Sequence, residues 1–154
     1  MTVLDRLAAL GLTLPPPPPP AGLYQPAIRS GALLYVSGQL NLAEGKLTAR
    51  GTVGESVSAD VAQDAARQAA LNCLAAAAGV LDSLDQIRQV VRLTGYVASA
   101  PGFTDQPAVI NGASAVFRDI FGERGVGSRL AIGVAALPLG APVEVDVILE
   151  IEGP

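Results

Sequence analysis

The sequence contains no histidine, a single cysteine and few aromatic residues. The absence of histidine excludes zinc sites with histidine ligands, haem held by an axial histidine and catalytic triads with a histidine base. The lone thiol, Cys73, excludes a disulfide within the chain and fits a reducing compartment. Hydrophobic residues make up 50% of the 154 positions, and many of them are alanine, so we expect a core packed densely from small side chains.

Excess positive charge and long apolar runs are also missing. The chain has 10 Lys and Arg against 14 Asp and Glu, a net charge of -4, which argues against nucleic acid or an anionic membrane as a partner. No stretch is apolar enough to predict a membrane span. Because Met1–Leu14 lacks a basic region followed by an apolar run, we expect no signal peptide and a cytoplasmic location.

The length suits one domain with a short extension, which we place at residues 1–20 before a main domain at 21–154. Residues Thr2–Leu10 have the pattern of a short helix, and the six prolines of Pro15–Pro20 predict a stiff polyproline II spacer. No basic residue flanks the prolines to orient an SH3 or WW domain. We therefore favour an arm that lets the helix reach across the surface or to a neighbouring subunit.

The main domain alternates between strand and helix patterns. The order of its elements predicts an α+β domain with one mixed sheet covered by two helices. We expect Pro138–Pro142 to form a tight turn that joins the last two strands as a hairpin. The predicted strands are Leu33–Gln39, Gln86–Ser99, Leu130–Leu137 and Val143–Ile151, preceded by an extended Tyr24–Arg29, and the predicted helices are Val57–Gly79 and Pro107–Phe121.

Two charged residues near the last strands are candidates for chemistry. Arg129 follows a glycine-rich loop and enters an apolar strand, where its guanidinium can bind a carboxylate through two hydrogen bonds or merely cap loop carbonyls. Glu144 opens the final strand, and across the predicted hairpin it favours an ion pair with Arg129 over an acid–base role. Cys73 lies on a stripe of small residues and is interpreted as a core residue, not a reactive thiol.

Several segments together resemble the RidA/YjgF family of reactive intermediate deaminases, also named L-PSP endoribonucleases. They are Tyr24, the stretch LLYVSGQ at Leu33–Gln39, and RLAIGVAALPLGAPVE at Arg129–Glu144. The extra N-terminal segment and the insertion Phe103–Pro107 make the chain most similar to the longer branch of that family.

The resemblance implies a chorismate-mutase-like fold with a six-stranded mixed sheet covered by two helices. It also implies a homotrimer with a central barrel and three clefts between subunits. The implied activity is that of a hydrolase similar to 2-iminobutanoate/2-iminopropanoate deaminase. Such an enzyme converts enamines and imines such as 2-aminoacrylate to 2-oxo acids and ammonia, without metal or cofactor.

The resemblance also implies a role for individual residues. Arg129 would bind the substrate carboxylate and Glu144 would hold and activate the attacking water. Tyr24 and Ser37 would line the cleft, and Asn111 would lie near it. An imine carbon is already electrophilic, so orienting substrate and water and moving one proton is sufficient chemistry.

Three positions depart from the pattern expected of the family. The segment Gly125–Ser128 replaces a basic, histidine-containing stretch, Ala131 replaces a cysteine, and Ser114 replaces an aromatic residue. The pocket and its natural substrate can therefore differ from those of the deaminases. A non-catalytic protein that binds a small carboxylate metabolite remains an alternative. An endoribonuclease is disfavoured by the net charge, the missing histidine and the few aromatics.

Overall fold

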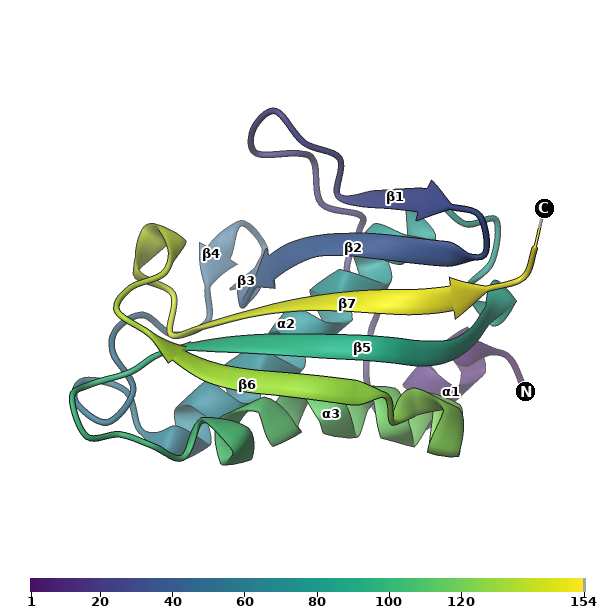
Figure 1. Cartoon of the computed structure of the whole chain (residues 1–154). Coiled ribbons are helices and arrows are strands. Elements are labelled where there is room, and N and C mark those ends of the chain that lie inside the picture. Colours follow the sequence, from purple (N-terminus) through teal and green to yellow (C-terminus); the bar gives the residue numbers. More distant parts are fainter. Residues whose placement is uncertain (154) are drawn as a thin grey trace.

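A central mixed sheet organises residues 1–153, which are the residues that the computed structural model describes (Figure 1). The strands lie in the order β1-β2-β7-β5-β6, and they span Ala27–Ser30, Leu33–Leu40, Val143–Ile151, Ile87–Ala98 and Ser128–Val134 in that order. The expected α+β architecture is confirmed, with five strands in the sheet in place of six. The polar segment after β2 forms a separate hairpin, β3 (Leu42–Ala43) and β4 (Lys46–Leu47), because Glu44 and Gly45 take positive φ angles and reverse the chain at once.

Two long helices cover one face of this sheet, α2 (Ala59–Ala78) and α3 (Gln106–Phe121). The Ser58 side chain accepts a hydrogen bond from the backbone N–H of Val61 at the start of α2, which caps the helix. Small residues allow the two helices to approach closely: a Cβ on Gly112 of α3 would collide with the backbone carbonyl of Gln63 in α2. This close crossing fixes the position of α3 relative to the sheet.

The N-terminal helix α1 (Val3–Ala9) lies on the same layer of helices. Arg6 Nη1 donates to the carbonyl oxygen of Ile120 at 2.6 Å, and the backbone N–H of Val3 donates to Asp85 Oδ1 at 2.8 Å. Val3 and Leu7 are buried in the common core. The N-terminal arm therefore places α1 against the surface of its own chain.

The expected hairpin between the last two strands is wrong. Strand β5 lies between them and pairs with β6 in parallel, Leu93 opposite Arg129, and with β7 in antiparallel, Tyr96 opposite Glu144. The physical reason is the β5–α3–β6 crossover, which returns the chain parallel to β5 and leaves β6 at the free edge. The segment before β7 consequently passes the end of β5 instead of turning back along β6.

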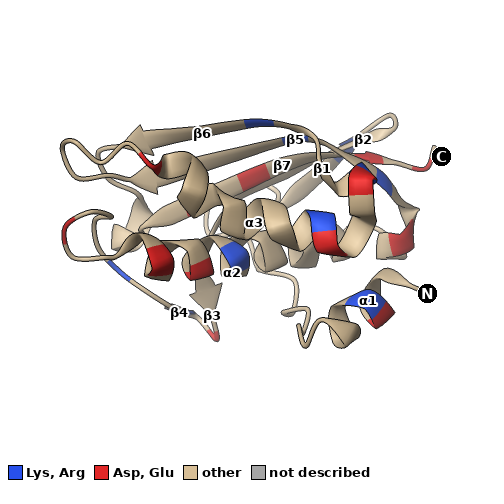
Figure 2. Cartoon of the chain, turned by 90° about the horizontal axis from the view of Figure 1, so that it is seen from below, with Lys and Arg blue, Asp and Glu red and all other residues tan. Residues whose placement is uncertain are grey.

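The two faces of the sheet differ strongly. Odd-numbered residues of β7 are buried against the helices, whereas the even-numbered ones are only half-buried. Cys73 of α2 is fully buried, its Sγ donates to the carbonyl oxygen of Val145 at 3.4 Å, and burial raises the pKa of the thiol, which confirms a core role. Among the described residues all three α-helices lie on one side of the sheet (Figure 2), so the other face is open in this part of the chain. Within residues 1–153, none of the helices is both long and apolar enough to span a bilayer.

Candidate functional site

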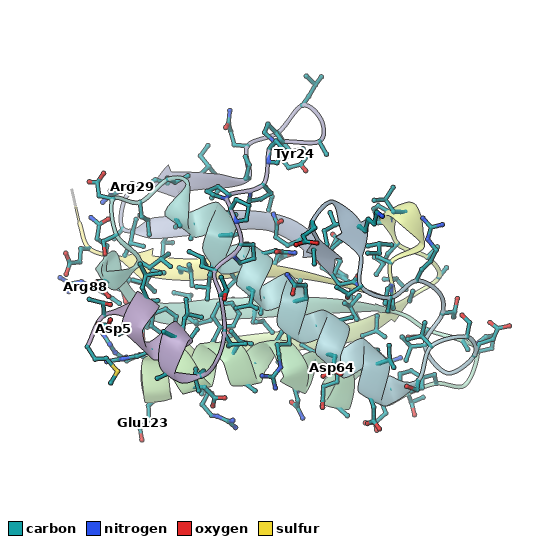
Figure 3. The ribbon with its side chains drawn as sticks, turned by 180° about the vertical axis from the view of Figure 1, so that it is seen from behind. Asp5, Tyr24, Arg29, Asp64, Arg88 and Glu123 are labelled. Carbon is teal, nitrogen blue, oxygen red and sulfur yellow. The ribbon has the colours of Figure 1, made fainter. Side chains whose placement is uncertain are left out.

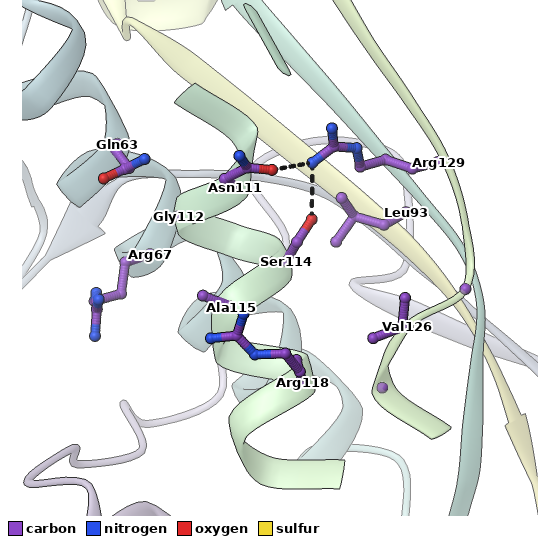
Figure 4. A pocket seen from close by; sticks show the side chains of 12 residues that line it. Gln63, Arg67, Leu93, Asn111, Gly112, Ser114, Ala115, Arg118, Val126 and Arg129 are labelled. Carbon is purple, nitrogen blue, oxygen red and sulfur yellow. Dashed lines mark hydrogen bonds between the residues drawn. The ribbon is translucent and has the colours of Figure 1, made fainter. Parts of the chain in front are cut away.

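Arg129 lies on the edge strand β6 and its side chain turns toward the helices. Its strand partner is Leu93, which is buried on the helix-covered face. Arg129 Nη1 donates to Asn111 Oδ1 at 2.7 Å and to Ser114 Oγ at 3.2 Å, both on α3 (Figure 4). The guanidinium is therefore positioned by neutral side chains, and within residues 1–153 no carboxylate pairs with it.

A cavity of about 520 Å³ opens beside this guanidinium. It is bounded by α2, α3, β6 and the segment Gly125–Gly127 that leads into β6. The partners of Arg129 are side chains of α3, not the loop carbonyls expected of a simple edge arginine. This geometry suits the binding of a small anion. We call Arg129, Asn111 and Ser114 with this cavity the arginine pocket.

Glu144 of β7 lies on the opposite, open face of the sheet. Its strand partner Tyr96 is three residues beyond Leu93 on β5, and side chains three apart on a regular strand point to opposite faces. The register of β2 against β7 shifts between Val36 and Gln39, and there the carboxylate lies over Gly38, where a Cβ would overlap Glu144 Oε2. Only glycine leaves room for this arrangement.

The environment of Glu144 favours its protonated form. Burial raises the pKa of Glu144, and the neighbouring Asp146 carboxylate raises it further. Tyr96 Oη donates to Asp146 Oδ2 at 3.3 Å. Burial also raises the pKa of Asp146, against the lowering effect of hydrogen bonds from Tyr96 and Thr94 and of the Arg92 charge. We call Glu144, Asp146, Tyr96 and Gly38 the acid patch, a group able to hold and transfer a proton.

Ser37 lies beside the acid patch, and Tyr24 lies on the loop that Ser37 holds. Ser37 directly precedes Gly38, and its Oγ donates to the carbonyl oxygen of Gln25 at 2.6 Å, which ties the preceding loop to β2. Tyr24 is exposed on this loop, which projects beyond β1 (Figure 3). Strand β1 is at one edge of the sheet and β6 at the other.

The predicted site residues therefore fall into two groups. Asn111 joins Arg129 in the arginine pocket, whereas Ser37 and its loop adjoin Glu144. The ion pair between Arg129 and Glu144, expected from a hairpin, does not form in the chain, because β5 separates their strands and the side chains point to opposite faces.

Comparisons with known proteins identify the family of the chain. A model of the family described as YjgF/chorismate mutase-like, putative endoribonuclease, matches residues 4–151. The chain belongs to the YjgF family. Protein TCP17 of Trypanosoma cruzi is 42% identical over 152 residues, which cover 97% of this chain and 94% of that protein.

Solved structures of YjgF-like proteins share the fold over nearly the whole chain. A crystal structure of Atu1372 from Agrobacterium tumefaciens, a protein of unknown function, is 45% identical with a TM-score of 0.90 and covers 98% of this chain and 94% of its own. A Shewanella oneidensis protein described as a putative endoribonuclease is 32% identical with a TM-score of 0.94, covering 98% and 100% of the two chains. The fold and family expected from the sequence are confirmed.

Several residues of this YjgF-family site were missed by sequence reasoning. Ser114 counted only as the loss of an aromatic residue, but its hydroxyl accepts a hydrogen bond from Arg129. Arg67 and Arg118 were not singled out, yet both line the cavity. The available signal was the spacing of Asn111, Ser114 and Arg118 on α3, three and four residues apart, which places them on one face of a helix.

The site offers little to a metal ion. Residues 1–153 contain no cluster of three or more His, Cys, Asp or Glu side chains arranged to hold one.

Proposed function

We propose that this YjgF-family protein hydrolyses enamines and imines that carry a carboxylate, releasing 2-oxo acids and ammonia. The observation that carries the proposal is the Arg129 guanidinium, which lacks an acidic partner in residues 1–153 and is held beside a cavity by Asn111 and Ser114. A planar guanidinium matches the two oxygens of a carboxylate. The substrate is thus a small anion.

The proposal requires two copies of the chain at each site. Arg129 and Glu144 lie on opposite faces of one sheet, so a small substrate that contacts both must meet them from different subunits. Among the described residues both edges of the sheet are unpaired. The open face also exposes apolar side chains that association would bury, namely Tyr35, Leu130 and Ile132. We propose a homotrimer in which the arginine pocket of one subunit faces the acid patch of the next.

In this mechanism Arg129 binds the substrate carboxylate through N–H groups that Asn111 and Ser114 leave free. A water molecule held by Glu144 of the partner subunit attacks the imine carbon, and the carboxylate takes up one proton of this water. The resulting Glu144 carboxyl gives this proton to the nitrogen, which yields a carbinolamine. The Glu144 carboxylate then takes the hydroxyl proton and passes it to the nitrogen as the C=O bond forms and the C–N bond breaks. The imine and one water molecule thus yield a 2-oxo acid and ammonia. The raised pKa of Glu144 suits both transfers, because the group gains and loses its proton nearer to neutral pH than an exposed glutamate.

The direct test is the rate at which the protein speeds the decay of 2-iminopropanoate, generated from alanine by an amino-acid oxidase. We expect clear acceleration by the parent protein. Glu144→Gln removes the proton-transfer group and should lower kcat by about 10²–10⁴-fold. Arg129→Lys keeps the charge but loses the planar fork, so it should mainly raise KM. Arg88→Ala, an exposed arginine outside both groups, is the matched control and should keep the parental rate.

Other outcomes distinguish the alternatives. Failure of the parent protein to accelerate imine decay contradicts the deaminase proposal. Binding of a 2-oxo acid at Arg129 without turnover would instead indicate a metabolite-binding protein. Cleavage of RNA that is lost in Glu144→Gln would indicate the endoribonuclease activity that the names of relatives state.

A further inference from the structure

The cavity beside Arg129 is lined by two more arginines. Arg67 of α2 and Arg118 of α3 border the same space (Figure 4), and no Asp or Glu is among the residues that line it. The chain as a whole carries a net charge of -4 and only 10 Lys and Arg residues. Three of these ten around one cavity reverse the sign of the charge locally, which attracts anions.

The charges of these arginines are only partly balanced by neighbours. Arg118 pairs with the adjacent Asp119 at 2.8 Å, but both side chains are well exposed, so the pair is weak and readily exchanged. Within residues 1–153, Arg67 forms no ion pair. The cavity therefore keeps more positive charge than one monocarboxylate can balance.

The size and the lining of the cavity also suit a ligand larger than a small monocarboxylate. Its volume of about 520 Å³ is in the range of sites for ligands larger than a three-carbon acid. Gly112 and Ala115 of α3 line it with minimal side chains and leave room above the helix. Arg118 is one helical turn beyond Ser114, a rise of about 6 Å along α3. A ligand held by Arg129 next to Ser114 can therefore reach Arg118 with a short second arm.

We propose that the protein prefers substrates with two anionic groups: Arg129 binds the α-carboxylate, while Arg118 and Arg67 bind a second carboxylate or a phosphate at the other end. The inference builds on the proposed function for its chemistry, because the reacting carbon remains that of the imine. It assigns Arg67 and Arg118 the choice of substrate and gives them no part in proton transfer.

Binding of stable product analogues tests this preference independently of catalysis. Calorimetric titration should show pyruvate, with one anionic group, binding at least tenfold more weakly than 2-oxoglutarate or 3-phosphohydroxypyruvate. The dianion that binds more tightly identifies the preferred second anionic group as a carboxylate or a phosphate. Arg67→Gln and Arg118→Gln should each weaken the binding of the preferred dianion about tenfold, the effect of one charged hydrogen bond. Both variants should bind pyruvate as tightly as the parent protein does. The control variant Arg88→Gln should change the binding of neither pyruvate nor the preferred dianion.

Comparing the hydrolysis of two imines tests this inference separately from the proposed function. The kcat/KM for 2-iminoglutarate should exceed that for 2-iminopropanoate, and the two arginine variants should remove the difference. Equal affinity for mono- and dianions, or equal losses for both in the variants, overturns the dianion preference even where imines are hydrolysed. A retained preference in binding without hydrolysis of either imine contradicts the deaminase proposal and leaves the dianion site intact. Unchanged melting temperatures of the variants show that they fold.

Discussion

The arginine pocket and the acid patch differ in the sign of their charged groups and in the surroundings of those groups. In the pocket, a cation on an edge strand is held by neutral side chains and faces a cavity. In the patch, two half-buried carboxyl groups share a central strand, and burial raises the pKa of both. In the proposed function the first region binds an anion and the second transfers a proton, and the sheet separates them. Under this proposal a single chain contains both parts of the site without assembling them.

The acid patch is most sharply tested by Gly38→Ala. The added methyl would overlap the Glu144 carboxylate, a movable group, so the side chain should swing away while the fold is kept. Misplacing a reacting group by about 1 Å costs on the order of 10²-fold in rate, and we expect a loss of that size in kcat with little change in melting temperature. The imine assay and thermal unfolding measure both. An unaltered kcat would contradict the importance of this placement.

The arginine pocket depends on the position of α3, which Gly112→Ala should disturb. Alanine normally stabilises a helix relative to glycine by about 0.5–1 kcal/mol. Here the methyl would collide with the Gln63 backbone, which cannot rotate away, so we expect a loss of about 1–3 kcal/mol in the free energy of unfolding. Urea unfolding gives the sign directly. Stabilisation by alanine would show that the helices do not cross as closely as described.

The smallest expected effect is a change in how stability depends on pH. The pKa of Glu144 in the folded state is raised above its ordinary value of 4.5. At pH values between 4.5 and the folded-state pKa, the folded state therefore binds more protons than the unfolded state. The free energy of unfolding should therefore fall as pH rises from 4.5 through the folded pKa. Glu144→Gln lacks this titration and should show a shallower fall in urea unfolding, with the remainder due to Asp146. Parallel curves for the two proteins would contradict the raised pKa.

Local features of the fold could be predicted from the sequence. Strand β7 spans Val143–Ile151, as predicted, and α2 spans Ala59–Ala78, within the predicted helix Val57–Gly79. Each of these depends on side chains within a few residues of one another, and such interactions can be recognised in the sequence itself.

The spatial relation of the site residues could not be predicted in the same way. Arg129 and Glu144 belong to strands that are consecutive in sequence, which favours pairing, but the crossover through α3 places β5 between them. The residues that were missed, Ser114 and Arg67, join the pocket only because two helices cross over the sheet. Strand order and helix crossing depend on the whole fold, so neither is visible in a local pattern.

The most direct test of a site shared between subunits is to mix two inactive variants. Arg129→Ala and Glu144→Gln, unfolded and refolded together in equal amounts, should form mixed trimers. In about one quarter of their sites an intact Arg129 faces an intact Glu144 of the neighbour. We predict recovery of about one quarter of the parental rate of imine hydrolysis. No recovery in mixtures in which differently tagged subunits co-purify would show that both residues act from the same chain, contrary to the arrangement proposed.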